Sequence, residues 1–206
     1  MVDIVSKIDR ATKIRQKEFA FYAKDKERIL DIGLFYRNQA LVEQKTQSQT
    51  IYGFDIRKRE LPEGYDYMVQ GDVQKISRYF ERNYFDAILL GEVIEHITDP
   101  YGTIGEISEI LSEDGILVLS TLNPHGFPLI FIEWLGIKKF FYTSYHAFLF
   151  PPRWMERILE SNELKVVKKY GYDFFVNFKV PVQLSYVMLF VSEKKKGHPA
   201  QYRVAQ

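Results

Sequence analysis

Short apolar runs alternate, up to residue 121, with segments in which apolar side chains recur every three or four positions. The run FDAILL at residues 85–90 is nearly continuous, as is typical of a central strand in a parallel sheet covered on both faces. Runs that predict strands occupy residues 29–32, 50–54, 65–70, 85–90 and 116–121. Segments with helical spacing occupy residues 38–47, 74–82 and 101–111. This alternation predicts an α/β protein with right-handed crossovers.

The two ends of the chain add further elements. Residues 3–24 carry apolar side chains at helical spacing, so residues 1–27 are expected to form an N-terminal helix that packs on the sheet or partly covers a ligand site. Residues 151–161 predict a helix with proline in its first turn, and residues 165–172 and 186–191 predict a final pair of strands. A chain of 206 residues suits one such domain.

Two segments lack a periodic pattern. Residues 124–150 are crowded with Phe, Tyr and Trp, and we interpret them as a lid or insertion. The tail at residues 194–206 is polar and is expected to be flexible.

Composition narrows the classes of partner. Lys and Arg number 28 against 27 Asp and Glu, a net charge of +1, so we expect no nucleic acid as a partner. The chain has no cysteine, which excludes disulfides and thiolate metal sites. The N-terminus lacks the apolar core of a signal peptide, and the longest nearly apolar stretch, 127–137, is far shorter than the ~20 residues that span a bilayer. We therefore expect a cytoplasmic protein with no membrane span.

Acidic residues and glycines stand at the ends of the predicted strands. Asp31 lies in the first strand, which ends at Gly33, and ligands of α/β proteins bind at the carboxyl ends of parallel strands. Asp55 follows the second strand, where a carboxylate can accept hydrogen bonds from ribose hydroxyls. Asp72 follows the third strand. Taken singly, Asp55 and Asp72 could also be helix caps or turn residues.

Three longer motifs follow in order: FDAILLGEVIEHITDP at 85–100, LSEDGILVLSTLN at 111–123 and YHAFLFPPRWMERILESNELKVV at 145–167. Together with the D-x-G at Asp31–Gly33 and the acidic residues at 55 and 72, they resemble class I S-adenosylmethionine-dependent methyltransferases. The resemblance implies a Rossmann-like three-layer αβα sandwich, with a seven-stranded, mostly parallel sheet whose last strand is antiparallel.

The resemblance also implies a cofactor, S-adenosylmethionine, and a set of residues that bind it. These are Asp31, Gly33, Leu34, Asp55, Ile56, Asp72, Val73, Gly91 and Glu92. Gly33 would leave room for the methionine part, since no Cβ intrudes there. Backbone N–H groups of residues 34–37 would face its carboxylate. The family usually continues as D-x-G-x-G-x-G, whereas Phe35 and Arg37 stand at the later glycine places; we predict that both side chains point away from the methionine pocket.

Methyl transfer to oxygen or nitrogen can require removal of a proton. We assign the catalytic role to Glu95, His96 and His146, with Glu92 as a further candidate. Residues 92, 95 and 96 are spaced i, i+3 and i+4, so a helical turn would place them on one face. Some related families hold a divalent metal with Glu-x-x-Glu-His, but many members do not, and we assign no metal. A purely structural role for His96 remains an alternative.

The aromatic segment at 124–150 stands where this family commonly builds its acceptor site. Its apolar character favours a small or medium-sized acceptor that is lipid-like or aromatic; the alternative is that the segment forms a homodimer interface. Three other functions are alternatives to this methyltransferase. The first is an inactive relative that only binds a partner, which Phe35 and Arg37 support. The second is a nicotinamide-dependent oxidoreductase, which is disfavoured because no G-x-G-x-x-G follows the first strand. The third is an RNA methyltransferase, which the near-neutral charge disfavours.

Overall fold

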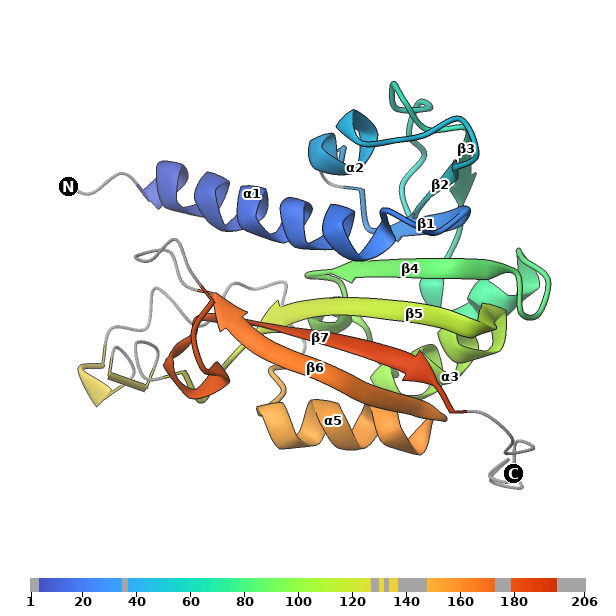
Figure 1. Ribbon diagram of the computed structural model, residues 1–206. Helices are drawn as coiled ribbons and strands as arrows, with labels where there is room; N and C mark the ends of the chain where they lie inside the picture. The colour runs from blue at the N-terminus through green and yellow to red at the C-terminus, as the bar shows by residue number, and fades with distance from the viewer. Residues whose placement is uncertain are drawn as a thin grey trace.

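The structure, a computed structural model, describes residues 4–34, 37–126, 130–131, 134–136, 148–172 and 179–195, with the backbone alone over residues 4–11. Its centre is a seven-stranded sheet in the order β3-β2-β1-β4-β5-β7-β6 (Figure 1). The strands are β1 (Arg28–Ile32), β2 (Thr50–Asp55), β3 (Tyr67–Gln70), β4 (Phe85–Gly91), β5 (Leu111–Leu122), β6 (Leu164–Tyr172) and β7 (Val187–Lys194). The first five pair in parallel, and β7 lies antiparallel between β5 and β6. The predicted Rossmann-like class is confirmed.

Helices cover both faces of this sheet, because the central strands are apolar on both sides. In β4, Ile88 and Leu90 face one layer, while Ala87 and Leu89 face the other. The first layer contains α3 (Pro100–Ile110), α5 (Pro152–Ser161) and the 3-10 helix η1 (Val73–Arg78). The second layer contains α1 (Ile4–Ala23) and α2 (Gln39–Glu43). Burial of both strand faces explains why the sequence shows continuous apolar runs.

The long helix α1 lies against the sheet at the end of β4, as Figure 1 shows. Phe19, Ala20 and Ala23 are its buried contacts, and they pack with the second face of the sheet. The helix expected over residues 3–24 therefore forms and packs on the sheet. In the described ranges, no helix combines the length and the apolar character needed to cross a bilayer.

Three element boundaries differ from the sequence-based expectation. The helix expected over 74–82 is the short η1, which has a non-helical kink at Lys75, and α2 ends at Glu43 rather than extending to residue 47. β5 begins at Leu111, five residues before the strand that was expected over 116–121. Leu111 pairs with Phe85 while Ile116 pairs with Ala87, so the residues between them form an irregularity in the ladder. Such a bulge has no hydrophobic period that a sequence pattern could reveal.

A buried hydrogen-bond chain fixes the segment that follows β1. The Tyr65 hydroxyl donates to Asp31 Oδ2 at 2.6 Å and accepts from the Asn38 backbone N–H at 3.2 Å. Asn38 in turn caps α2, since its Oδ1 accepts from the Leu41 N–H at 3.1 Å. Burial raises the pKa of Asp31 from 3.8 to about 6, although the Tyr65 hydroxyl opposes this shift.

Because the native pKa of Asp31 is above that of the unfolded chain, this group stabilises the fold at low pH. That contribution is lost as the pH rises from about 4 through about 6. The wild type should lose about 3 kcal/mol of stability between pH 3 and pH 7 relative to Asp31→Asn, whose side chain cannot ionise. Urea unfolding at a series of pH values measures this difference. Stability curves that run parallel over the whole range would contradict the prediction.

Candidate functional site

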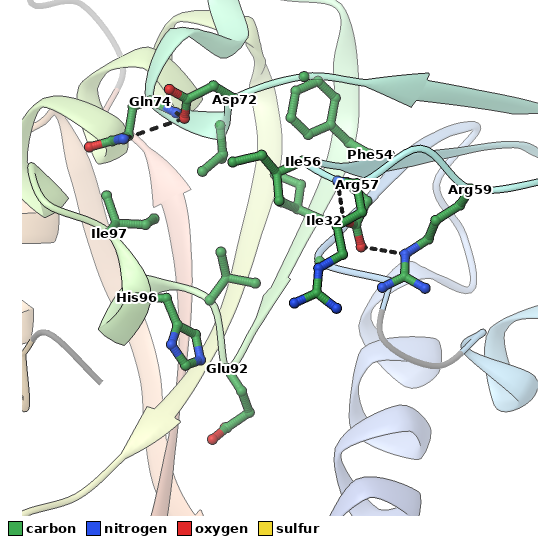
Figure 2. A pocket seen from close by; sticks show the side chains of 15 residues that line it. Ile32, Phe54, Ile56, Arg57, Arg59, Asp72, Gln74, Glu92, His96 and Ile97 are labelled. Carbon is green, nitrogen blue, oxygen red and sulfur yellow. Dashed lines mark hydrogen bonds and ion pairs between the residues drawn. The ribbon is translucent and has the colours of Figure 1, made fainter. Parts of the chain in front are cut away.

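The carboxyl ends of β1, β2, β3 and β4 enclose a cavity of about 670 Å³. The parallel register aligns these ends, since Ile32 pairs with both Phe54 and Leu90, and Asp55 pairs with Gln70. Figure 2 shows the side chains that line it. They are Ile32, Gly33, Phe54, Asp55, Ile56, Arg57, Arg59, Gly71, Asp72, Val73, Gln74, Glu92, Val93, His96 and Ile97. The walls of the cavity are therefore mainly apolar. The charged groups that line it are the carboxylates of Asp55, Asp72 and Glu92 and the guanidinium groups of Arg57 and Arg59.

Gly33 is required where β1 turns away from the sheet. Its φ is +84°, and a Cβ at this position would lie 2.2 Å from Val93 Cγ2. Its N–H donates to the Phe54 carbonyl at 2.9 Å, which ties the turn to β2. A side chain here would displace Val93 from the cavity wall.

Asp55 ends β2 with its carboxylate held on both oxygens. Oδ1 accepts from the Arg57 N–H at 2.8 Å, and Oδ2 accepts from Arg59 Nε at 2.7 Å. The side chain is only 7% exposed although it lines the cavity. Next to it, the side chain of Ile56 is 68% exposed, an uncommon exposure that offers an apolar surface at the cavity edge.

Asp72 lies across the cavity and caps η1. Its Oδ1 accepts from the Gln74 N–H at 3.0 Å, while no described residue donates to Oδ2. Gln74 also accepts, through Oε1, from the Thr98 hydroxyl at 2.7 Å and from the Asp99 N–H at 3.1 Å. The loop after β3 is thereby tied to the loop that leads into α3, which closes this side of the cavity. Asp72 is a helix cap and a cavity residue at once.

Glu92 follows β4 with a φ of +55°, a conformation that L-residues rarely adopt. Its Oε1 accepts from the Ser120 hydroxyl at 3.1 Å and lies 3.8 Å from Arg15 Nη1 of α1. Gly91 allows this approach, because a Cβ there would lie 3.1 Å from Arg15 Cδ. The unusual backbone of Glu92 is thus stabilised by groups from two neighbouring elements.

The segment after Glu92 does not form the helical face that was expected for Glu92, Glu95 and His96. A 3-10 turn, η2 (Ile94–His96), begins after Glu92, so the three residues do not follow one helix. His96 is exposed and lines the cavity, whereas Glu95 is fully buried. Oε2 of Glu95 accepts from the Thr121 hydroxyl at 3.2 Å, while no described residue donates to Oε1. Burial, and then the nearby Glu92 carboxylate, raise the pKa of Glu95 well above its ordinary value, which favours the neutral acid.

The structure brings most of the residues assigned to the cofactor to this cavity. Those that line it are Gly33, Asp55, Ile56, Asp72, Val73 and Glu92. Asp31 and Leu34 are buried beneath it, and Gly91 lies under α1. His146 and Phe35 are outside the described residues. Arg37 does not line the cavity: its Nη1 pairs with Glu63 at 2.7 Å and its Nε donates to Gln39 at 3.0 Å. The side chain of Arg37 thus points away from the cavity, as predicted.

Several residues of the site were not singled out from the sequence: Arg57, Arg59, Gln74 and Arg15. A charge run such as RKR at 57–59 ordinarily marks a solvated loop, so no pattern separates a cavity residue from a surface one. Arg15 is 77 positions before its partner Glu92 in the sequence, and only the packing of α1 brings the two together. Among the described residues, no group of three or more His, Asp or Glu side chains is arranged to hold a metal ion.

Comparisons with known proteins agree with this geometry. The sequence model of a family described as "Methyltransferase domain" matches residues 7–169. A ubiquinone biosynthesis O-methyltransferase of Dinoroseobacter shibae is 32% identical over 92 residues, which is 42% of this chain but only 37% of that protein. The chain therefore matches well under half the length of this relative.

Solved structures share the fold at low sequence identity. A SAM-dependent methyltransferase from Archaeoglobus fulgidus has a TM-score of 0.67 at 17% identity, with 88% of this chain and 92% of that chain covered. Magnesium protoporphyrin IX methyltransferase from Synechocystis, solved with bound SAH, has a TM-score of 0.66 at 15% identity, with 95% and 89% covered. Because the family match extends over most of the sequence and includes the whole cavity, the chain belongs to the methyltransferase domain family and has the fold of the S-adenosylmethionine-dependent class I methyltransferases.

Proposed function

We propose that this protein is an S-adenosylmethionine-dependent methyltransferase acting on a small or medium-sized, partly apolar acceptor. The observation that carries the proposal is the cavity at the carboxyl ends of β1 to β4, with Asp55 and Asp72 on its walls and Gly33 at its base. A carboxylate after the second strand and an acid after the third suit an adenosine group. Membership of the methyltransferase domain family supports the reaction class.

The residues present fit this cofactor. Asp55 would accept hydrogen bonds from the ribose hydroxyls, and the Oδ2 of Asp72 would accept one from the adenine amino group. Ile56 would lie against the adenine ring. Gly33 leaves the space that a Cβ would fill, and Glu92 brings a negative charge to the methionine end. When bound, S-adenosylmethionine supplies a methyl group on a sulfonium, whose sulfur leaves as a neutral thioether.

For an oxygen or nitrogen acceptor, this chain must also hold the acceptor in line and remove its proton. We propose His96 for proton removal, because its imidazole lines the cavity and is exposed. Glu95 is buried and favours its neutral form, so we propose that it acts through Glu92 rather than on the acceptor itself. The role proposed for His146 rests on the family resemblance alone.

The acceptor side is proposed to lie beside the aromatic segment. Its described residues Ile130, Phe131, Trp134 and Leu135 are all about half exposed or more, and the rings of Phe131 and Trp134 stack with centroids 6.3 Å apart. Such apolar surface suits a hydroxylated aromatic ring that carries an apolar chain. The partial match to a ubiquinone biosynthesis O-methyltransferase supports an oxygen acceptor of this kind.

An inactive, partner-binding relative is the second candidate, favoured by Phe35 and Arg37 at the places of two family glycines. The position of Arg37 weakens this alternative, because its guanidinium is paired with Glu63 outside the cavity. Calorimetric titration with S-adenosylhomocysteine separates the two functions. If millimolar S-adenosylhomocysteine does not bind, the proposed enzymatic function is wrong.

Replacement of Asp55 by Asn should weaken binding of S-adenosylhomocysteine by about 10- to 100-fold, since the charge-assisted bonds to the ribose are lost. Calorimetry on the purified variant measures the dissociation constant. Glu109→Gln is the control, because Glu109 pairs with Arg82 on the surface and does not line the cavity. Equal affinities for Asp55→Asn and the wild type would place the adenosine elsewhere.

Replacement of His96 by Ala should lower kcat by about 10²-fold or more, while the affinity for S-adenosylhomocysteine changes less than about twofold. Transfer of radiolabelled methyl from S-adenosylmethionine to a catechol carrying a short isoprenoid chain measures kcat. Unchanged kcat would favour the structural role of His96. Should this probe not be methylated by the wild type, fractionated cell extract supplies acceptors without presuming their class.

Replacement of Trp134 by Ala should raise the KM for the same apolar catechol about fivefold or more, because part of the apolar contact is removed. Trp154→Ala on α5 is the matched control, since Trp154 is also exposed but lies on a different element. Sedimentation of both variants tests the competing explanation. A change from dimer to monomer in Trp134→Ala, at unchanged KM, would assign the segment to a homodimer interface instead.

A further inference from the structure

The carboxylate of Asp55 is oriented by donors from its own loop. The backbone N–H of Arg57 holds Oδ1 at 2.8 Å, and the Nε–H of Arg59 holds Oδ2 at 2.7 Å. With one donor on each oxygen, rotation of the carboxylate about its last bond would break both hydrogen bonds. Its orientation is therefore set by the protein and needs no ligand.

The remaining capacity of this carboxylate matches a pair of adjacent hydroxyls. An ionised carboxylate has about four lone-pair sites, and the loop donors use two of them, one on each oxygen. No other described residue donates to the Asp55 carboxylate, so one site on each oxygen is left, and the side chain lines the cavity. Two neighbouring hydroxyl groups, such as the 2′- and 3′-hydroxyls of a ribose, can donate one hydrogen bond to each.

We propose that Arg59 is a positioning residue that makes Asp55 specific for the ribose diol of adenosine ligands. This inference rests on the proposed function, because it assumes that an adenosine group enters the cavity. The guanidinium holds Oδ2 and so keeps both oxygens of the carboxylate available to the two hydroxyls. Specificity for the diol follows, since a ribose that lacks one hydroxyl leaves one oxygen of Asp55 without its second donor.

The opposite role, in which Arg59 blocks Asp55 and must be displaced by the ligand, fits the geometry less well. Among the described contacts, Arg59 reaches Asp55 through Nε alone, which leaves a second lone pair of Oδ2 unused. In the view of Figure 2, Arg59 lies on the side opposite to Asp72 and Gln74. A ligand that spans from Asp55 to Asp72 would therefore approach the carboxylate from the other side.

Arg57 offers a matched control within the same loop. Its side chain also lines the cavity, but no described residue pairs with its guanidinium, and it reaches Asp55 through its backbone N–H. Arg57→Met therefore removes one positive charge from the cavity wall and keeps the hydrogen bond to Oδ1. Arg59→Met removes the same charge and also removes the donor to Oδ2, because a methyl group takes the place of Nε.

The test compares S-adenosylhomocysteine with its 2′-deoxyribose analogue by calorimetry on the full chain. We expect the wild type and Arg57→Met to prefer the ribose ligand by about tenfold. For Arg59→Met we expect about tenfold weaker binding of S-adenosylhomocysteine and a preference for ribose that falls to about twofold or less. Arg59→Lys, which keeps the charge but not the planar donor geometry, should lie between the two. Thermal unfolding checks that each variant is folded.

The outcomes separate this inference from the function on which it rests. Tighter or unchanged binding in Arg59→Met would overturn the positioning role, as would an equal loss in Arg57→Met and Arg59→Met. A folded Arg59→Met that binds more weakly but keeps the wild-type preference for ribose would also overturn it. A wild type that binds neither ligand would overturn the proposed function, and this inference with it.

Discussion

Parallel pairing between β1 and β4 is the interaction on which the site depends. The pairing runs from Ile29 opposite Ala87 to Ile32 opposite Leu90, and both strands end at the same edge of the sheet. At the opposite end of the strands, the backbone N–H and the guanidinium of Arg28 donate hydrogen bonds to the Asp86 carboxylate, which fixes the register between β1 and β4. A shift of one residue would move Gly33 and Glu92 relative to each other and would turn every side chain to the wrong face.

Carboxyl groups in and around the cavity divide into two kinds by their surroundings. Asp55 and Glu92 line the cavity and lie 2.7 Å and 3.8 Å from the guanidinium nitrogens of Arg59 and Arg15. Asp31 and Glu95 lie beneath the cavity with little or no exposure, and burial raises the pKa of both. Negative charge is thereby placed on the cavity wall and kept low in the core, where an uncompensated charge would be costly.

Most of the fold could be predicted from the sequence, because each strand carries its own signal. The run at 85–90 had to be a buried strand, and β4 (Phe85–Gly91) occupies that place. Gly33, Asp55 and Asp72 could be placed around one cavity because each lies at or just after the carboxyl end of a strand, and parallel strands bring these ends to one edge. The turn after Glu92 was predicted wrongly. The spacing of residues 92, 95 and 96 fits a helix, but it does not reveal that Glu92 has a φ of +55° and therefore lies outside the short 3-10 turn that follows.

The sequence by itself determined the order of strands and helices, the layered class and the acidic residues at strand ends, since all of these follow from local patterns of polarity. Only the tertiary structure decided which polar side chains meet. Arg15 reaches Glu92 across the packing of α1, Glu95 turns into the core, and Arg59 holds Asp55. These contacts depend on side-chain direction and on the packing of distant elements, which hydrophobic periodicity does not encode. The glycine-ended strand predicted a cavity at this edge of the sheet, and the packing around it decided which groups line that cavity.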